Sequence, residues 1–137
     1  MAYWLMKSEP SAYSWEQLVK DKRTSWSGVR NYQANNNMKA MAIGDETFFY
    51  HSNEDRAIVG IMKIVGLWHL DPSDESGKFG MVDVAPVRAV KAPLTLAVIK
   101  AHAKLAQMVF VRQGRLSVSP VMAEEWKEII KLSETEV

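Results

Sequence analysis

Lys7 and Ser8 follow directly on Tyr3–Met6, an aromatic and apolar run that is typical of a β-strand. A strand that opens into a loop places short polar side chains at the rim of a sheet, and loops held by a rigid scaffold carry a large share of binding residues. A lysine there could hold an anion, and a serine could donate or accept a hydrogen bond. The alternative is that Lys7 is solvated and Ser8 merely caps a turn.

A second candidate is a tryptophan in a polar, turn-like segment. Trp26 precedes Gly28 and is placed by neither helical nor strand periodicity. Its ring could cover the edge of the core or form one wall of a pocket. Arg30, Asn31 and Gln33 follow within a few residues, and such side chains make bidentate contacts with base edges or phosphates. A solvated helix face would show the same composition.

The third segment, Phe48–Asn53, ends in polar residues that a second strand would carry to the same rim. A histidine can activate a serine only within hydrogen-bond reach. His51 and Ser52 point to opposite faces of a strand, which leaves a pair of Ser8 with His51 geometrically open. A hydrolase or small-molecule-binding protein using Ser8, His51 and Arg112 in one cleft is therefore the alternative reading, although no G-x-S-x-G turn marks a nucleophile.

The fourth segment is a turn with two arginines. Arg112 and Arg115 flank Gln113-Gly114, and Ser117 follows. Residues 100–115 hold four Lys or Arg and no acid, although the whole chain has 17 basic against 16 acidic residues and a formal charge of +1. Positioning of phosphates is a natural use for such a pair. An ordinary solvated turn is the alternative.

Several classes of function are disfavoured by composition. The chain has no cysteine, which excludes thiolate metal sites and disulfides, and its three histidines lack neighbours at ligand spacing. No glycine-rich phosphate loop is present. We therefore expect no metal and no cofactor. With 137 residues, 47% of them hydrophobic, and without a spanning run or a secretion signal, the chain predicts a single domain over 1–137, cytoplasmic and without a membrane segment.

The elements that must position these residues are predominantly strands. Capping residues Ser14 and Thr95 predict short helices after them, and a stripe of Met122, Trp126, Ile129 and Ile130 predicts a C-terminal helix packed on the core. Residues 31–42 have helical spacing. Strands are predicted over 3–6, 46–51, 57–68, 80–90, 105–111 and 116–121. This order predicts the α+β class with a mostly antiparallel, curved or barrel-like sheet, in which Pro86 marks an edge or a bulge.

Taken together, these stretches resemble the EVE domain, a PUA-like family. The resemblance runs in order along nearly the whole chain and rests on 3–10, 13–15, 26–34, 48–53, 82–84 and 111–118. Two positions depart from the family pattern: Asn35 stands where the family often has Arg, and Ser27 stands where Asp is common.

The resemblance implies a PUA-like twisted β-barrel with peripheral helices, similar to the YTH readers of methylated adenosine. It implies a non-catalytic module with a rim pocket, lined by Trp26, for a modified or flipped base of DNA or RNA, with Lys7-Ser8 and Trp26 as the equivalents of the YTH cage. We expect a monomer that uses no cofactor and takes nucleic acid as its partner. The predicted ligand-binding residues are Lys7, Ser8, Trp26, Arg30, Asn31, Gln33, His51, Ser52, Arg112, Gln113, Arg115 and Ser117.

Nine of the twelve predicted residues receive a role in this hypothesis. Trp26 stacks on the base. The polar edge of the base is read by Ser8, Asn31, Gln33 and Ser52. Flanking phosphates are held by Lys7, Arg30, Arg112 and Arg115.

Overall fold

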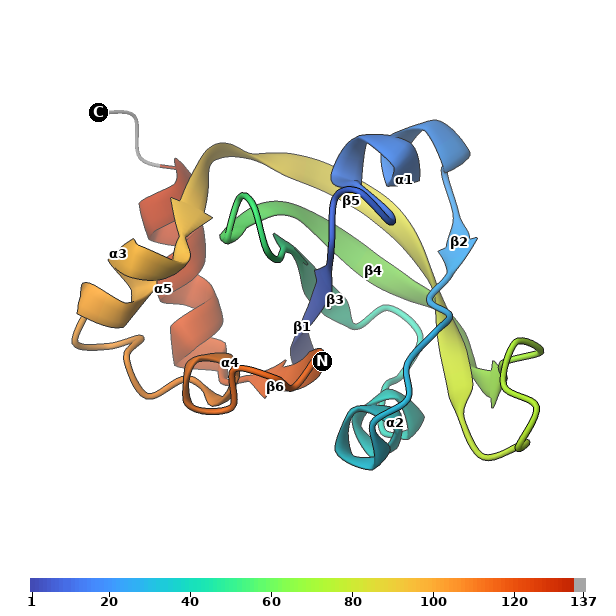
Figure 1. Cartoon of the computed structure of the whole chain (residues 1–137). Helices are drawn as coiled ribbons and strands as arrows, with labels where there is room; N and C mark the ends of the chain where they lie inside the picture. Colours follow the sequence, from blue (N-terminus) through green and yellow to red (C-terminus); the bar gives the residue numbers. More distant parts are fainter. Residues whose placement is uncertain (135–137) are drawn as a thin grey trace.

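One six-stranded sheet organises the chain, with helices on both of its faces (Figure 1). The computed structural model describes residues 1–134. The elements are β1 (Tyr3–Ser8), α1 (Trp15–Asp21), β2 (Thr24–Ser25), α2 (Tyr32–Lys39), β3 (Glu46–His51), β4 (Ala57–Leu70), β5 (Gly80–Thr95), α3 (Leu96–Ala101), α4 (Val109–Arg112), β6 (Val118–Val121) and α5 (Ala123–Glu134). The predicted α+β class is confirmed.

The sheet is not closed into a barrel. Its order is β2-β5-β4-β3-β1-β6, and within residues 1–134 the outer strands β2 and β6 do not pair with each other. Strands β1 and β3 are parallel, and the other pairs are antiparallel. The expectation of a β-barrel is wrong in this respect because α2 lies at the open side, where Asn37 Nδ2 donates to the Val118 carbonyl at 2.8 Å.

Alternation along the central strands builds two cores, one on each face of the sheet. In β1, Trp4 and Met6 enter the core beneath α1 and α2, whereas Leu5 enters the core beneath α5. In β3, Phe49 joins the first core and Phe48 joins the second. Successive side chains of a strand point to opposite faces, so a strand covered on both sides is apolar throughout. The rim of this doubly covered sheet is where polar residues emerge.

The C-terminal helix packs as predicted, with one exception. The Trp126 ring stacks between Phe48 and Tyr3, at centroid distances of 3.8 and 4.5 Å. Ile129 is fully buried, but Met122 is 64% exposed because the helix begins only at Ala123. Trp126 and Ile129 therefore belong to the core, and Met122 does not.

The prediction of a strand over 105–111 is wrong. Consecutive turns occupy its first part, with Leu105 N–H bonded to His102 O and Met108 N–H to Leu105 O, and α4 occupies its end. Leu105, Met108 and Phe110 are nevertheless buried. Their apolar side chains therefore indicated burial, but they did not indicate a strand. Pro86 is confirmed at an irregular position, since the β4–β5 register shifts between Ile61 and Met62, opposite it. Among the described residues, no helix combines the length and the apolar character that crossing a membrane requires.

Candidate functional site

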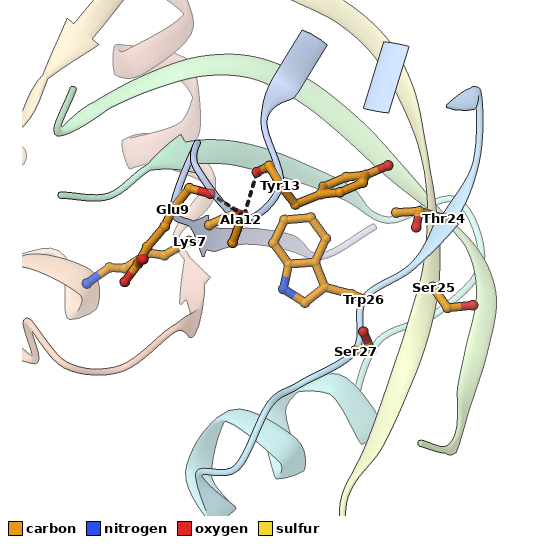
Figure 2. Close-up of a pocket in the computed structure, with 9 residues that line it drawn as sticks. Lys7, Glu9, Ala12, Tyr13, Thr24, Ser25, Trp26 and Ser27 are labelled. Atoms are coloured by element: carbon orange, nitrogen blue, oxygen red, sulfur yellow. Dashed lines mark hydrogen bonds between the residues drawn. The ribbon is translucent and has the colours of Figure 1, made fainter. Parts of the chain in front are cut away.

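A cavity of about 400 Å³ opens where β1, the loop before α1 and β2 meet (Figure 2). We call it the Trp26 cavity. It is lined by Lys7, Ser8, Glu9, Ala12, Tyr13, Thr24, Ser25, Trp26 and Ser27. Three of the predicted site residues, Lys7, Ser8 and Trp26, thus lie together. The volume falls within the range of roughly 300–1,000 Å³ that is common for small-ligand sites.

The short strand β2 and a glycine turn hold Trp26 at this place. Its backbone N–H donates to the Val82 carbonyl at 2.8 Å, which continues the pairing of β2 with β5. Gly28 then turns the chain with a φ of +84°, a conformation that side chains with a Cβ rarely adopt. Its N–H donates to Asp71 Oδ2 at 2.8 Å. Both flanks of Trp26 are therefore tied to distant parts of the chain.

The indole of Trp26 is mostly buried. It is 7% exposed and packs edge-to-face with Phe49 at 5.3 Å and with Tyr13 at 6.5 Å between ring centroids. The ring is thus part of the first core as well as the cavity wall. A ring standing free at the mouth of a pocket is not what the structure contains, since most of the aromatic surface is covered by its neighbours.

The indole N–H remains available on the cavity side. No acceptor for Trp26 Nε1 is present in the described part of the chain. The fully buried polar side-chain atoms without a partner there are Thr47 Oγ1 and Ser119 Oγ, so the Trp26 nitrogen retains access to open space. Figure 2 shows it on the ring edge away from Tyr13. The cavity therefore offers a fixed hydrogen-bond donor from an otherwise buried ring.

Most of the other lining groups are already engaged. Ser8 Oγ donates to the Tyr13 carbonyl at 2.6 Å, which ties β1 to the loop before α1. Ser25 Oγ donates to Asp83 at 2.6 Å. Burial alone would raise the pKa of Asp83, but hydrogen bonds from Ser25, His69 and Arg23 outweigh burial and lower it. These contacts tie the wall of the cavity to the loop before α1 and to β5.

Lys7 is the cation of the cavity and also reaches beyond it. Its Nζ donates to the Gly114 carbonyl at 2.8 Å and lies 5.6 Å from the ring centroid of Phe110. Burial lowers the pKa of Lys7. Gly114 belongs to the arginine-flanked turn that the sequence singled out, so the predicted first and fourth segments do meet. They meet through a backbone carbonyl and not through the arginines.

Lys7 also lines a second cavity of about 230 Å³, which we call the Tyr50 cavity. Its lining residues are Lys7, Tyr50, Ser52, Asn53, Arg56, Leu96, Lys100, Phe110, Val111 and Gly114. The predicted site residue Ser52 lies here, apart from Trp26. Its backbone N–H donates to the Ser8 carbonyl at 2.9 Å, which places the two cavities on either side of the end of β1.

Arg30, Asn31 and Gln33 do not line either cavity. The Arg30 guanidinium bonds to Asp71 at 3.3 Å and to Ser73 at 3.0 Å. Asn31 caps α2, with its Oδ1 accepting the Ala34 N–H at 2.9 Å, and Gln33 is exposed on the same helix. The polar residues gathered at this point of the sequence therefore start α2 and form an ion pair with Asp71, and they do not line a cavity.

Both residues that depart from the family pattern, Asn35 and Ser27, have a defined position in the structure. Asn35 is buried, and its Oδ1 accepts both Trp68 Nε1–H at 2.8 Å and the Gly80 N–H at 3.0 Å. It therefore ties α2 to the β4–β5 hairpin. Ser27 lies at the exposed edge of the Trp26 cavity, and its hydroxyl has no hydrogen-bond partner among the described residues.

Ser8 and His51 are register partners in β1 and β3, but they form no catalytic pair. His51 Nε2 accepts the Trp15 N–H at 3.0 Å, and Nδ1 lies 2.7 Å from Asp55 Oδ2. A backbone N–H can only donate, so Nε2 is unprotonated and Nδ1–H donates to Asp55. With both ring nitrogens engaged and Ser8 bonded to Tyr13, the hydrolase alternative lacks its base.

The remaining predicted residues surround the turn after α4. Arg112 Nε donates to the Gln107 carbonyl at 2.9 Å, and Gln113 ends α4 through its backbone. Arg115 is exposed, and the Ser117 carbonyl accepts the Lys7 N–H at 2.9 Å. None of these four side chains lines either cavity. Within residues 1–134 no three His, Asp or Glu side chains gather to hold a metal ion.

Tyr13, Thr24 and Ser25 line the Trp26 cavity but were not among the predicted site residues. Tyr13 Oη donates to Asp21 at 2.8 Å, and burial and this bond raise the pKa of Tyr13. One signal was available: Tyr13 directly precedes the predicted helix cap Ser14, so a short loop had to bring it back toward Ser8. No comparable signal pointed to Thr24 and Ser25, because a two-residue strand has no periodicity.

Comparisons with known proteins agree with the resemblance seen in the sequence. The family model of the EVE domain matches residues 2–132. Human thymocyte nuclear protein 1 is 37% identical over 169 aligned positions, which cover 98% of this chain and 75% of that protein.

Two solved structures extend these findings. The crystal structure of the human THYN1 protein in complex with 5-methylcytosine-containing DNA has a TM-score of 0.91 at 37% identity and covers 100% of both chains. The YTH domain of Zygosaccharomyces rouxii MRB1, in complex with N6-methyladenosine RNA, has a TM-score of 0.60 at 17% identity and covers 99% of this chain and 86% of that one. At that identity the YTH likeness concerns the fold alone, and it confirms the predicted structural relationship.

Proposed function

The chain belongs to the EVE domain family, and on that premise we propose that it binds a modified or flipped nucleobase in the Trp26 cavity without catalysing a reaction. The observation that carries the proposal is the unpartnered Nε1–H of Trp26, held in a buried ring that lines a cavity of about 400 Å³. The complex of human THYN1 with 5-methylcytosine-containing DNA supports nucleic acid as the ligand class.

The cavity combines the two kinds of contact that a base requires. Tyr13 and the uncovered part of the Trp26 ring supply the aromatic surface, and contact between a base and an aromatic side chain contributes up to about 1–3 kcal/mol. Trp26 Nε1–H and the Ser27 hydroxyl can donate to oxygen or nitrogen acceptors on the base edge. A ligand that covered the indole N–H without pairing it would bind more weakly by about 1–3 kcal/mol. Selectivity therefore comes from the acceptor pattern of the base.

Access to such a cavity requires a base outside the helical stack. Flipping a base from a duplex costs a few kcal/mol, and a single strand or a mismatch costs less. We therefore expect single strands to bind more tightly than a paired duplex of the same sequence. The cavity itself carries one cation, Lys7, and one carboxylate, Glu9, so attraction of phosphates must come mainly from outside it.

Catalysis is not part of the proposal. A hydrolase built on Ser8 would need a base within hydrogen-bond reach. Both nitrogens of His51 are bonded elsewhere, to the Trp15 N–H and to Asp55. A cytoplasmic monomer remains our expectation for the state in which the protein acts.

The test is binding of labelled single-stranded oligonucleotides, identical except for one 5-methylcytosine or cytosine, followed by fluorescence anisotropy. Trp26→Phe keeps an aromatic ring in the core and removes the N–H. We expect it to weaken binding of the preferred oligonucleotide by about tenfold, since a lost hydrogen bond to a buried donor corresponds to roughly 1–2 kcal/mol.

Trp68→Phe is the matched control. It removes an indole N–H that bonds to Asn35 and does not line the cavity. We expect its affinities to match those of the wild type. Equal affinity of wild type and Trp26→Phe for both oligonucleotides, with the fold intact by circular dichroism, would contradict the base-binding role of the cavity.

A further inference from the structure

The Tyr50 cavity lies on the other side of Lys7 from the Trp26 cavity and has a strongly cationic lining. Lys7, Arg56 and Lys100 line it, and none of its lining residues is an Asp or Glu. We propose that the Tyr50 cavity binds a phosphate group, namely a backbone phosphate of the strand whose base occupies the Trp26 cavity. The assignment to a strand rests on the proposed function; the anion site itself rests on the contacts below.

Tyr50 supplies the first of these contacts. Its side chain is 3% exposed, and its hydroxyl has no hydrogen-bond partner among residues 1–134. The hydroxyl is not one of the fully buried unpartnered atoms there, so it retains access to the cavity that Tyr50 lines. Burial raises the pKa of Tyr50, although the charge of Arg56 opposes this. The phenol therefore keeps its proton at neutral pH and can donate a hydrogen bond to a phosphate oxygen.

Arg56 is fixed beside the cavity by its own backbone turn. Its Nε donates to the Asn53 carbonyl at 3.1 Å, which leaves both terminal nitrogens of the guanidinium without a partner in the described part of the chain. Terminal guanidinium nitrogens bind phosphate oxygens well because the fork matches their geometry. The neighbouring acid, Asp55, bonds to His51 Nδ1 and does not line the cavity.

The turn that carries Arg56 has a strained backbone. Asn53 and Arg56 have φ angles of +67° and +47°, in the left-handed region, which asparagine tolerates and arginine rarely adopts. Strain of this kind persists where the surrounding structure enforces it, and it is concentrated at ligand sites. Here the turn brings Asn53 and Arg56 to the same wall as Ser52. The conformation thus brings three of the lining residues to the cavity from one turn.

Lys7 connects the two cavities. It lines both of them, and its Nζ is held 5.9 Å from the Tyr50 ring centroid. A nucleotide with its base beside Trp26 would therefore direct its sugar and phosphate past Lys7. The Tyr50 cavity supplies the phosphate contacts that Arg30, Arg112 and Arg115 do not provide at either cavity.

The test uses Tyr50→Phe and Lys100→Gln in two binding assays. Tyr50→Phe removes only the unpartnered hydroxyl, and Lys100→Gln removes an exposed charge, so neither change should disturb the fold. With the 5-methylcytosine oligonucleotide, we expect each variant to bind about fivefold more weakly than the wild type. Lys100→Gln should also reduce the slope of log affinity against log salt by about 0.7, whereas Tyr50→Phe should leave it unchanged.

Tyr32→Phe and Lys91→Gln are the matched controls, because both residues are exposed and neither lines the two cavities. They should bind as the wild type does. In the second assay, inorganic phosphate is titrated into the protein and amide NMR shifts are followed. We expect the Ser52 and Asn53 amides to shift in the wild type and to shift much less in Lys100→Gln.

The outcomes separate this proposal from the base-binding one. Wild-type affinity and salt slope in both cavity variants, while Trp26→Phe loses binding, would overturn the strand phosphate and leave the base site standing. Phosphate-induced shifts in that case would assign the cavity to free phosphate instead. If no oligonucleotide binds at all, the base site fails, and the absence of phosphate-induced shifts would overturn the anion site as well.

Discussion

The Nε2 atom of His51 accepts the backbone N–H of Trp15 at 3.0 Å, which joins the end of β3 to the first residue of α1. The first N–H groups of a helix have no partner within the helix, and burial of an unpaired one is costly. Asp55 holds the other ring nitrogen and thereby sets the tautomer that accepts. A histidine beside a serine in space is therefore a structural support for the loop that forms the Trp26 cavity.

Replacing His51 should therefore lower stability. His51→Phe keeps a ring beside Phe49 but leaves the buried Trp15 N–H without an acceptor. We expect the free energy of unfolding to fall by about 1–3 kcal/mol in urea titrations. His69→Phe is the control, since the exposed His69 ring pairs only with Asp83, which keeps its bonds to Ser25 and Arg23, and a change there should stay within about 1 kcal/mol. Equal stability of the two variants would contradict the supporting role.

Gly60 should tolerate no side chain. A Cβ built at Gly60 would lie 2.5 Å from the ring of Trp15, which packs over this part of β4. Gly60→Ala would force the indole and α1 to shift, and overpacking of this kind costs about 1–3 kcal/mol. Thermal unfolding measures the loss. Gly114→Ala is the matched control because a Cβ there meets nothing within 4 Å. Similar midpoints for both variants would show that Trp15 moves without cost.

Stability should decrease at acid pH through Asp71. Burial would raise the pKa of this carboxyl, but hydrogen bonds from Ser73, Gly28 and Arg30 outweigh burial and hold it far below its ordinary value. A carboxyl with a depressed folded-state pKa stabilises the fold fully above its unfolded pKa, near 3.9, and loses that contribution as the pH falls toward the folded-state value. Asp71→Asn should thus cost about 1–3 kcal/mol at pH 7.

The same variant defines the pH window. The difference in unfolding free energy between wild type and Asp71→Asn should stay constant from pH 7 to about 5 and shrink below about pH 4. Urea titrations at pH 7, 5, 4 and 3 measure it. Glu75→Gln, an exposed carboxyl in the same loop, should show no such trend. A difference that does not depend on pH would contradict the assignment to the charge of Asp71.

Local features of the chain could be predicted because neighbouring residues decide them. Ser14 and Thr95 cap their helices as expected, accepting the N–H groups of Gln17 and Val98. Aromatic content over 46–51 and alternation over 80–90 located β3 and the first part of β5, which continues to Thr95. The end of β1 was also predictable as a place for Lys7 and Ser8, since an apolar run that stops at a polar loop defines a sheet rim.

Other features depended on contacts between distant residues. Arg30 was predicted to hold phosphate, but its guanidinium meets Asp71, 41 residues away. Asp71 looked like one more acid in a polar loop, yet it is buried and organises the turn after Trp26. Leu105, Met108 and Phe110 reach the second core from turns and a short helix, because burial constrains where apolar side chains end and not the backbone that carries them.

The sequence by itself determined the α+β class, the caps, the main strands and the presence of an aromatic and polar rim. These follow from periodicities of two and 3.6 residues and from groups only a few residues apart. Tertiary structure alone decided that the sheet stays open beside α2, that Tyr13 packs against Trp26, and that Lys7 shares a cavity with Arg56 and Lys100 and not with Arg112 and Arg115. Charges and rings pair when they lie close in space, and strand order and loop paths decide which of them do. The spacing of residues along the sequence does not contain that information.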